Sequence, residues 1–281
     1  MKVVILCGGL GTRLREETEF RPKPMVEIGG RPILWHIMKT YAHHGLREFV
    51  LCLGYKGNVV KDYFLNYAAM NGDFTTTLGR NRMIAFHDRC AEENFTVTLA
   101  ETGAETMTGG RIARIQRYIQ DDAGFVMTYG DGLSDLDVGM MLDFHRSHGK
   151  LATIMTVRPS TRFGAVEMAH QRRVFRFAEK PRAEGWCSGG VFVLRPEVFG
   201  YLGGDDCVFE RSPLERLAAD GQLMAYQHEG FSYAMDTYCE YLHLNELWAK
   251  GNAPWKVWDD TPIPAKPAVP AEHTEAWVAR R

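Results

Sequence analysis

The sequence predicts an α/β protein in which helices flank a mostly parallel β-sheet. Short apolar runs rich in β-branched residues alternate with longer amphipathic segments, as in repeated strand–helix units. The apolar runs lack polar alternation, which is typical of strands that are buried on both faces. A length of 281 residues with 45% hydrophobic composition is also sufficient for a large core.

Four strand–helix pairs are expected in the first part of the chain. The predicted strands cover residues 3–7, 48–53, 95–100 and 125–129. The helices that follow them are predicted over residues 33–43, 59–69, 111–120 and 138–148. Because ligands of such sheets bind beyond the carboxyl ends of the strands, residues 8–13 and 130–135 are the first places to search for a site.

After about residue 150 the predicted strands lie closer together. Strands are expected over residues 152–157, 164–169, 174–179 and 189–194, with turns at 162–164 and 171–172, and helices over 213–219 and 238–250. We therefore expect one domain over residues 1–258, with two halves that meet near residue 150. A proline-rich, extended tail follows over residues 259–281. Residues 71–94 fit either a β excursion or an insertion that contacts a partner.

Charge and cysteine content exclude several classes of protein. The chain carries 33 basic and 35 acidic residues, mixed along its length, so neither nucleic acid nor an anionic membrane is an expected partner. The six cysteines form no CxxC pair, and Cys7 and Cys52 lie in apolar runs, as buried reduced thiols do. No apolar run reaches the roughly 18 residues of a membrane helix, and the run over residues 3–7 is too short for a signal peptide. A cytoplasmic protein is expected.

A glycine-rich loop follows the first predicted strand. Its residues are Gly8, Gly9, Leu10, Gly11, Thr12 and Arg13. The glycines allow a tight turn whose backbone N–H groups converge on an anion, and the Arg13 guanidinium suits phosphate oxygens. A dinucleotide fingerprint would need glycine in place of Leu14, and the Walker pattern GxxxxGK[ST] is absent. The loop therefore predicts a different kind of phosphate site, with an ordinary structural turn as the alternative.

Lys23 follows ten residues after Arg13 and lies between Pro22 and Pro24. The two prolines are expected to hold the backbone extended and to keep the lysine out of a helix. A cation presented rigidly beside a glycine loop suits a triphosphate, whereas an isolated surface lysine is the alternative interpretation.

Together these segments resemble the sugar-nucleotide pyrophosphorylases, and most closely the glucose-1-phosphate cytidylyltransferases of bacterial O-antigen and dideoxysugar pathways. The motifs that carry the resemblance are GGLGTRLREET (8–18), RPKPMVEIGGRPILWHIM (21–38), GYKG (54–57), TGGR (108–111), TYGDGLSDLD (128–137), RFGA (162–165), EKP (179–181), GGVFVL (189–194), MDT (235–237) and LWAKGNAPWKVW (247–258). The resemblance implies a Rossmann-like nucleotide-diphospho-sugar transferase fold. It also implies that residues 1–150 bind the nucleotide and that residues 151–258, with a small β-rich portion, bind the sugar.

Two aspartates are the expected ligands of Mg²⁺. Asp131 follows the apolar run 125–129, which places its carboxylate at the carboxyl end of a strand near the glycine loop. A divalent ion on triphosphate oxygens takes one or two carboxylates and waters, and the resemblance implies Asp236 as the second. From the residues alone, a turn at Asp131 and a helix N-cap at Asp236 stay open as alternatives.

The resemblance also implies the residues that surround the two substrates. Lys180 is expected to contact the sugar phosphate, Glu179 the sugar hydroxyls, and Tyr129 and Arg162 are expected to border the sugar phosphate. The residues expected at the nucleotide base or ribose are Thr108, Gly110 and Arg111.

The sequence departs from the family on the sugar side. The family carries Asn-Gly-Gly where this chain has Ser188, Gly189 and Gly190, and serine is shorter with one donor fewer. The segment 231–234 also lacks the tryptophan that the family tends to show before the second metal aspartate. Both changes concern the identity of the acceptor.

The expected activity is transfer of a cytidylyl group from CTP to α-D-glucose 1-phosphate, which gives CDP-glucose and pyrophosphate. Cations would align two mutually repelling polyanions, and no general base is needed because a phosphate dianion is already nucleophilic. Another acceptor, another nucleotide such as UTP or dTTP, and a non-catalytic nucleotide-binding regulator stay open as alternatives. Relatives form symmetric oligomers, so a homo-oligomer is expected, with residues 71–94 and the tail as candidate contact elements.

Overall fold

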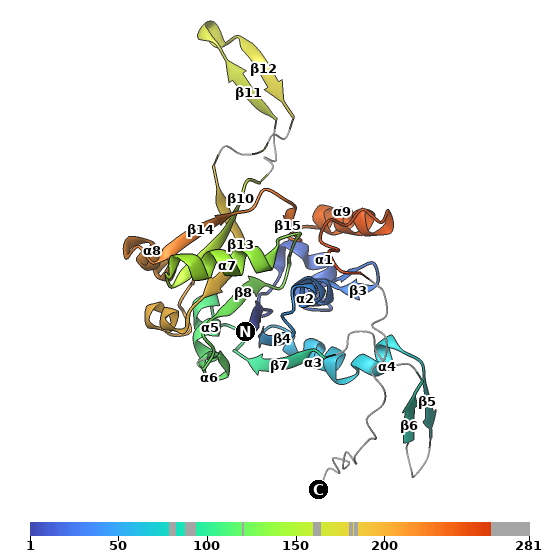
Figure 1. Cartoon of the computed structure of the whole chain (residues 1–281). Coiled ribbons are helices and arrows are strands. Elements are labelled where there is room, and N and C mark those ends of the chain that lie inside the picture. Colours follow the sequence, from blue (N-terminus) through green and yellow to red (C-terminus); the bar gives the residue numbers. More distant parts are fainter. Residues whose placement is uncertain are drawn as a thin grey trace.

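A mixed β-sheet forms the centre of the protein (Figure 1). The computed structural model describes residues 1–78, 83–87, 94–119, 121–159, 164–179, 182 and 185–259. Within these ranges seven strands join in the order β14 (Leu223–Gln227), β10 (Ala152–Val157), β13 (Cys187–Leu194), β8 (Phe125–Tyr129), β1 (Val3–Leu6), β4 (Glu48–Leu53) and β7 (Thr96–Glu101). Among these seven described strands only β13 runs antiparallel to its neighbours in the sheet. The predicted mostly parallel sheet is confirmed.

Both faces of the sheet are buried, as the unbroken apolar runs predict. In the central strand β1, Val3 and Ile5 pack into one core, while Val4 and Leu6 pack into the other. The first core is completed by α2 (Ile33–His43), α3 (Gly57–Leu65), α7 (Val138–His148) and α9 (Tyr238–Ala249). The second is completed by α5 (Thr108–Arg114), α6 (Gln116–Ile119) and α8 (Ser212–Ala219). The parallel strands therefore end on one edge between two helical layers.

Two predicted helices are each interrupted, so the prediction of a single helix was wrong in both places. The helix expected over 59–69 divides into α3 and α4 (Tyr67–Asn71) at Asn66, whose side-chain amide donates to Asp62 Oδ1 and to the Asp62 carbonyl. Such local side-chain bonds compete with the helical ladder. The helix expected over 111–120 divides into α5 and α6 at Ile115.

The predicted burial of Cys7 and Cys52 as free thiols is confirmed.

The remaining elements are short and lie at the edges of the sheet. They are α1 (Arg15–Thr18), the 3-10 helices η1 (Thr12–Leu14), η2 (Lys23–Met25), η3 (His170–Arg172) and η4 (Pro196–Tyr201), and the paired strands β2 (Glu27–Ile28) with β3 (Arg31–Pro32) and β9 (Gly132–Ser134) with β15 (Ser232–Ala234). None of the described helices combines the length and apolar character needed to cross a bilayer.

Two hairpins project away from the sheet in different directions (Figure 1). β5 (Phe74–Thr77) pairs with β6 (Met83–Phe86), which confirms a β excursion within residues 71–94. β11 (Ala165–Met168) pairs with β12 (Val174–Ala178), and η3 forms the turn predicted at 171–172. Residues 162 and 163 of the other predicted turn, and the tail after Asp259, lie outside the described residues.

His36 links helix α2 to the segment after α9. Its Nε2 lies 2.9 Å from the Ile28 carbonyl oxygen, and Trp255 Nε1 donates to its Nδ1 at 3.3 Å. The rings of Trp35 and Trp248 meet the imidazole edge-on at 5.0 and 4.6 Å. Since one ring nitrogen must donate and the other accept, the imidazole is neutral in this arrangement. Burial accordingly lowers the pKa of His36 to about 4.

This link predicts a loss of stability in mild acid. The unfolded chain binds a proton at His36 below about pH 6.5 while the folded chain does not, so the free energy of unfolding falls between pH 6.5 and 4, by about 3 kcal/mol from this residue. Urea unfolding at several pH values measures the slope. His36→Gln should be less stable at pH 7 and show a shallower slope, whereas the exposed His43→Gln should keep the wild-type slope. Equal slopes for all three proteins would contradict the assignment.

Candidate active site

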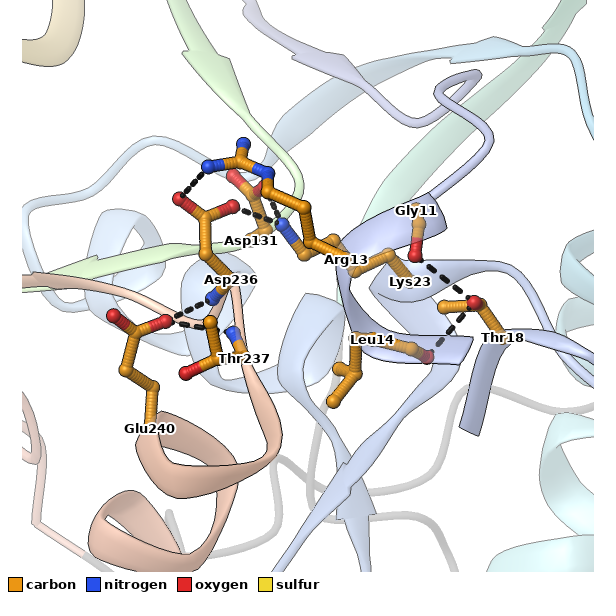
Figure 2. Close-up of polar contacts among 9 residues, drawn as sticks. All are labelled: Gly11, Arg13, Leu14, Thr18, Lys23, Asp131, Asp236, Thr237 and Glu240. Carbon is orange, nitrogen blue, oxygen red and sulfur yellow. Dashed lines mark hydrogen bonds and ion pairs between the residues drawn. The ribbon is translucent and has the colours of Figure 1, made fainter. Parts of the chain in front are cut away.

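The glycine loop leaves the carboxyl end of β1 and is held in shape by Thr18. Gly11 adopts φ +64°, and a Cβ at this position would lie 2.7 Å from Thr18 Cγ2. The Thr18 hydroxyl lies 2.8 Å from the Leu14 carbonyl oxygen and 3.0 Å from that of Gly11 (Figure 2). Thr18 is buried, so this contact is shielded from water. The loop is therefore a braced turn that requires glycine at position 11.

Arg111 supports the same loop through a hydrogen bond to its backbone. Its guanidinium donates to the carbonyl oxygens of Gly8 at 3.0 Å, Leu53 at 3.1 Å and Gly103 at 2.8 Å, and to Thr102 Oγ1 at 2.8 Å. A Cβ at Gly8 would lie 2.1 Å from Arg111 Nη1, so only glycine fits there. The side chain that was expected at the nucleotide base or ribose thus joins the chain segments at the ends of β1, β4 and β7.

Lys23 carries its ammonium group to two carboxylates. Its Nζ lies 2.6 Å from Asp131 Oδ2 and 2.6 Å from Asp236 Oδ1, and Arg13 Nη1 lies 2.9 Å from Asp236 Oδ2 (Figure 2). The predicted extended backbone holds for Pro22 but is wrong for Lys23, which opens the 3-10 helix η2. Proline is tolerated at the start of such a turn because its missing N–H would have no partner there. The structure therefore brings four predicted residues together.

The two aspartates are placed by a short β-ladder and a helix cap. In the antiparallel pair β9–β15, the backbone N–H of Met235 donates to the Asp131 carbonyl oxygen at 2.9 Å. Glu240 Oε2 accepts from the backbone N–H of Asp236 at 2.6 Å and of Thr237 at 2.7 Å, as part of the capping box that begins α9. The separation of the two carboxylates is thus set by backbone pairing.

Two cavities meet at Asp131 and Tyr129. The first, of about 350 Å³, is named here the glycine-loop cavity; its predicted lining residues are Gly8, Gly9, Gly11, Thr12, Arg13, Lys23, Thr108, Arg111, Tyr129 and Asp131. The second, of about 340 Å³, is named the Ser188 cavity and is lined by Tyr129, Asp131, Ser188, Gly189 and the segment 232–234, among others. Ligands in the two cavities would therefore approach one another beside the ion-pair cluster.

Some predicted residues lie elsewhere. Gly110 is packed in α5, where a Cβ would lie 2.8 Å from the backbone of Asp205. Glu179 follows β12, is exposed, and is not among the residues that line the two cavities. Lys180 and Arg162 lie outside the described residues.

Ser188 Oγ accepts the N–H of Gly190 at 3.3 Å, which leaves its own proton available to a ligand.

The sequence did not point to Glu210, which lines the glycine-loop cavity. Its carboxylate accepts the hydroxyl protons of Tyr129 and, at 2.5 Å, of Thr108. Burial, followed by the charge of Glu210, raises the pKa of Tyr129 above its ordinary value, so the phenol stays protonated as a donor. Thr18 was missed in the same way, since its partners are backbone groups that no sequence pattern marks. Glu240 was also missed, although the capping-box pattern Thr237-x-x-Glu240 could have identified it.

The donor set at the cluster fits one Mg²⁺ ion. Asp131 and Asp236 both reach a single ammonium nitrogen, so both can reach a single cation. Over the described part of the chain, no group of three or more His, Cys, Asp or Glu side chains could hold a metal. Two carboxylates completed by waters and substrate phosphates are the usual ligand set of Mg²⁺ in phosphoryl-transfer sites.

Sequence comparisons place the chain among nucleotide-using transferases. The family model described as "Nucleotidyl transferase" matches residues 2–261. Glucose-1-phosphate cytidylyltransferase of Salmonella typhimurium is 50% identical over 260 residues, which is 92% of this chain and 100% of that protein. The probable glucose-1-phosphate cytidylyltransferase of Bacillus subtilis is 42% identical over 261 residues, with the same coverage of 92% and 100%.

Solved structures share the fold at lower identity. HddC from Yersinia pseudotuberculosis complexed with GMP-PN has a TM-score of 0.64 and 23% identity, covering 88% of this chain and 99% of that one. UDP-glucose pyrophosphorylase complexed with UDP-glucose has a TM-score of 0.64 and 16% identity, covering 89% and 98%. Both agree with the predicted α/β fold.

The Thr18 brace predicts a defined mutational effect. Thr18→Val keeps the shape of the side chain but removes the donor from two loop carbonyls, so we expect a loss of about 1–2 kcal/mol in urea unfolding. Affinity for a nucleoside triphosphate, measured by calorimetry, should fall several-fold because the loop loses its fixed shape. Thr18→Ser, which retains the hydroxyl, serves as the matched control. If the valine variant bound as tightly as the serine variant, the brace would have no part in binding.

Proposed function

This chain belongs to the nucleotidyl transferase family, and from that premise we propose that it transfers a cytidylyl group from CTP to α-D-glucose 1-phosphate. The products are CDP-glucose and pyrophosphate. The observation that carries the proposal is the meeting of two cavities at Tyr129 and Asp131, beside the cluster of Arg13, Lys23 and Asp236. The named activity of the relatives that are 50% and 42% identical supports CTP and glucose 1-phosphate as the substrates.

The triphosphate lies in the glycine-loop cavity, with Arg13 and Lys23 on its phosphates. The sugar phosphate enters from the Ser188 cavity, and one of its oxygens attacks the α-phosphorus in line with the bond to the β-phosphate. A new P–O bond forms, the α–β bond breaks, and pyrophosphate leaves with the electron pair. Because the attacking phosphate is already ionised, the chain supplies charge and alignment and does not need to remove a proton.

Asp131 and Asp236 hold the Mg²⁺ ion in this proposal. When bound, the ion supplies positive charge to the triphosphate oxygens and to the leaving pyrophosphate. Lys23 adds a second cation from its proline-flanked turn, and Arg13, whose side chain is 68% exposed, is free to follow the nucleotide. Arg111 and Thr18 act through the loop backbone, whose N–H groups point at the phosphates.

The acceptor is the sugar phosphate, and in this proposal it binds in the Ser188 cavity. Residues 1–150 bind the nucleotide and residues 151–258 the sugar phosphate, with Tyr129, Ser188 and Gly189 lining the cavity that receives the sugar. Contacts of Glu179, Lys180 and Arg162 with the sugar phosphate are proposed from the family resemblance alone. A different phosphorylated acceptor is the second candidate, because Ser188 and the segment 232–234 line this cavity and both belong to the part of the sequence that departs from the family.

We also propose a cytoplasmic homo-oligomer that supplies CDP-glucose for O-antigen or related sugar pathways. The two projecting hairpins support self-association, because both carry exposed apolar side chains that a lone hairpin does not bury. They include Phe74, Ile84 and Phe86 on β5–β6 and Phe175 and Phe177 on β11–β12.

A substrate panel tests the function. The full chain is mixed with Mg²⁺, each of CTP, UTP, dTTP and GTP, and either glucose 1-phosphate or another sugar 1-phosphate, and product mass and pyrophosphate are measured. We expect CDP-glucose as the main product. Silence with every nucleotide and glucose 1-phosphate would remove the proposed activity. A larger yield with another acceptor would establish the second candidate.

The role of Asp131 is tested separately. Asp131→Asn should reduce turnover by about 10³-fold or more, since it removes a charge that holds the metal at the reacting phosphates. Asp143→Asn, in an exposed ion pair with Arg146, is the matched control and should retain activity. Circular dichroism and the thermal midpoint confirm that both variants fold. Activity near wild type in Asp131→Asn would exclude the metal assignment.

A further inference from the structure

Lys23 occupies the point between Asp131 and Asp236 where the two carboxylates converge. Both N···O distances are 2.6 Å, and only 11% of the lysine side chain is exposed. Two carboxylates that approach one site repel each other unless a cation lies between them. The lysine ammonium therefore satisfies, in the protein itself, the same electrostatic requirement that a divalent ion would satisfy.

The backbone of Lys23 is fixed, although its side chain can turn. Val26 N–H donates to the Lys23 carbonyl oxygen at 3.1 Å within η2. The neighbouring Pro24 packs on the end of β8, where a Cβ at Gly130 would lie 2.7 Å from its ring. The lysine also lines the glycine-loop cavity. A phosphate in that cavity can thus draw the ammonium away from the carboxylates without any movement of the main chain.

The charges at the cluster indicate the direction of this exchange. Lys23 and Arg13 contribute two positive charges, and Asp131 and Asp236 contribute two negative charges, so their pairing is neutral. A divalent ion alone would add positive charge to a balanced cluster and would have to displace the lysine. A triphosphate brings negative charge into the cluster. Once the metal has displaced them, Lys23 and Arg13 can pair with that charge.

We propose that Lys23 is a positioning residue that holds the metal aspartates together and competes with the metal until a triphosphate withdraws it. Metal and nucleotide consequently bind with positive coupling, each raising the affinity of the chain for the other. This inference rests on the proposed metal and nucleotide sites, and it adds an order to their occupation that the proposed reaction does not require.

Binding of Mn²⁺ without nucleotide tests the competition. The free Mn²⁺ signal in electron paramagnetic resonance gives the affinity of the full chain for this probe. Wild type should bind Mn²⁺ weakly, and Lys23→Met should bind it about tenfold more tightly or better, because the competing cation is gone. Lys23→Arg, which keeps a cation, should stay close to wild type, and Lys250→Met, from an exposed ion pair, should match it. Adding Asp236→Asn to Lys23→Met should abolish the gain.

A thermal measurement supplies a second readout. In EDTA, Lys23→Met and the milder Lys23→Gln should melt below wild type because two carboxylates repel each other, and Mn²⁺ should raise their midpoints more than that of wild type. Equal Mn²⁺ affinity in wild type, Lys23→Met and Lys23→Gln would overturn the inference. A gain in Mn²⁺ affinity without pyrophosphate release from any nucleotide would support it while removing the proposed activity, so the two failures can be told apart.

Discussion

Repulsion between Asp131 and Asp236 is the constraint around which the site is built. The ends of the β9–β15 ladder place the backbone of Asp131 beside that of Met235, the residue before Asp236, so backbone pairing brings the two aspartates to one region. Lys23 and Arg13 bring compensating charge from the loop side, and Glu240 fixes the backbone of one aspartate at the start of α9. Elements from both halves of the chain therefore bring the two carboxylates to the same ammonium group.

Arg111 imposes a second constraint, on the other side of the glycine loop. Its guanidinium is buried and binds carbonyl oxygens at the ends of three strands, so the loop after β1 shares one support with the segments after β4 and β7. Gly8 and Gly54 both lie against this side chain and have no room for a Cβ. A residue that was expected to contact a ligand thus holds the backbone of the glycine loop in place.

Periodicity and motif together predicted the sheet, most helices, and the meeting of Arg13, Lys23, Asp131 and Asp236. The sheet, the helices, the glycine loop and Asp131 depend on apolar runs and on residues that follow strands directly, which are visible in a single sequence, whereas Asp236 was expected from the family resemblance. The supports of the site were not predictable in this way. Thr18 acts on backbone atoms and Glu210 meets Tyr129 across 81 positions, so only the folded chain reveals these two. Glu240 differs, because the capping-box pattern Thr237-x-x-Glu240 is visible in the sequence. The interruption at Asn66 was also not predicted; it coincides with side-chain bonds from Asn66 to Asp62 that no apolar pattern marks.

The hydrogen bond between His36 and Trp255 affects the order in which parts of the chain can fold. The two residues are 219 positions apart. Helix α2 can therefore pack against nearby strands early in folding, but Trp255 can pack on it only after nearly the whole domain has been made. Contacts of such long range slow folding, because a large loop must close before they contribute. The ion pair between Lys23 and Asp236, which are 213 positions apart, must also form late in folding. A nascent chain thus carries the glycine loop well before Asp236 can pair with Lys23, and the proposed metal site is completed together with the core.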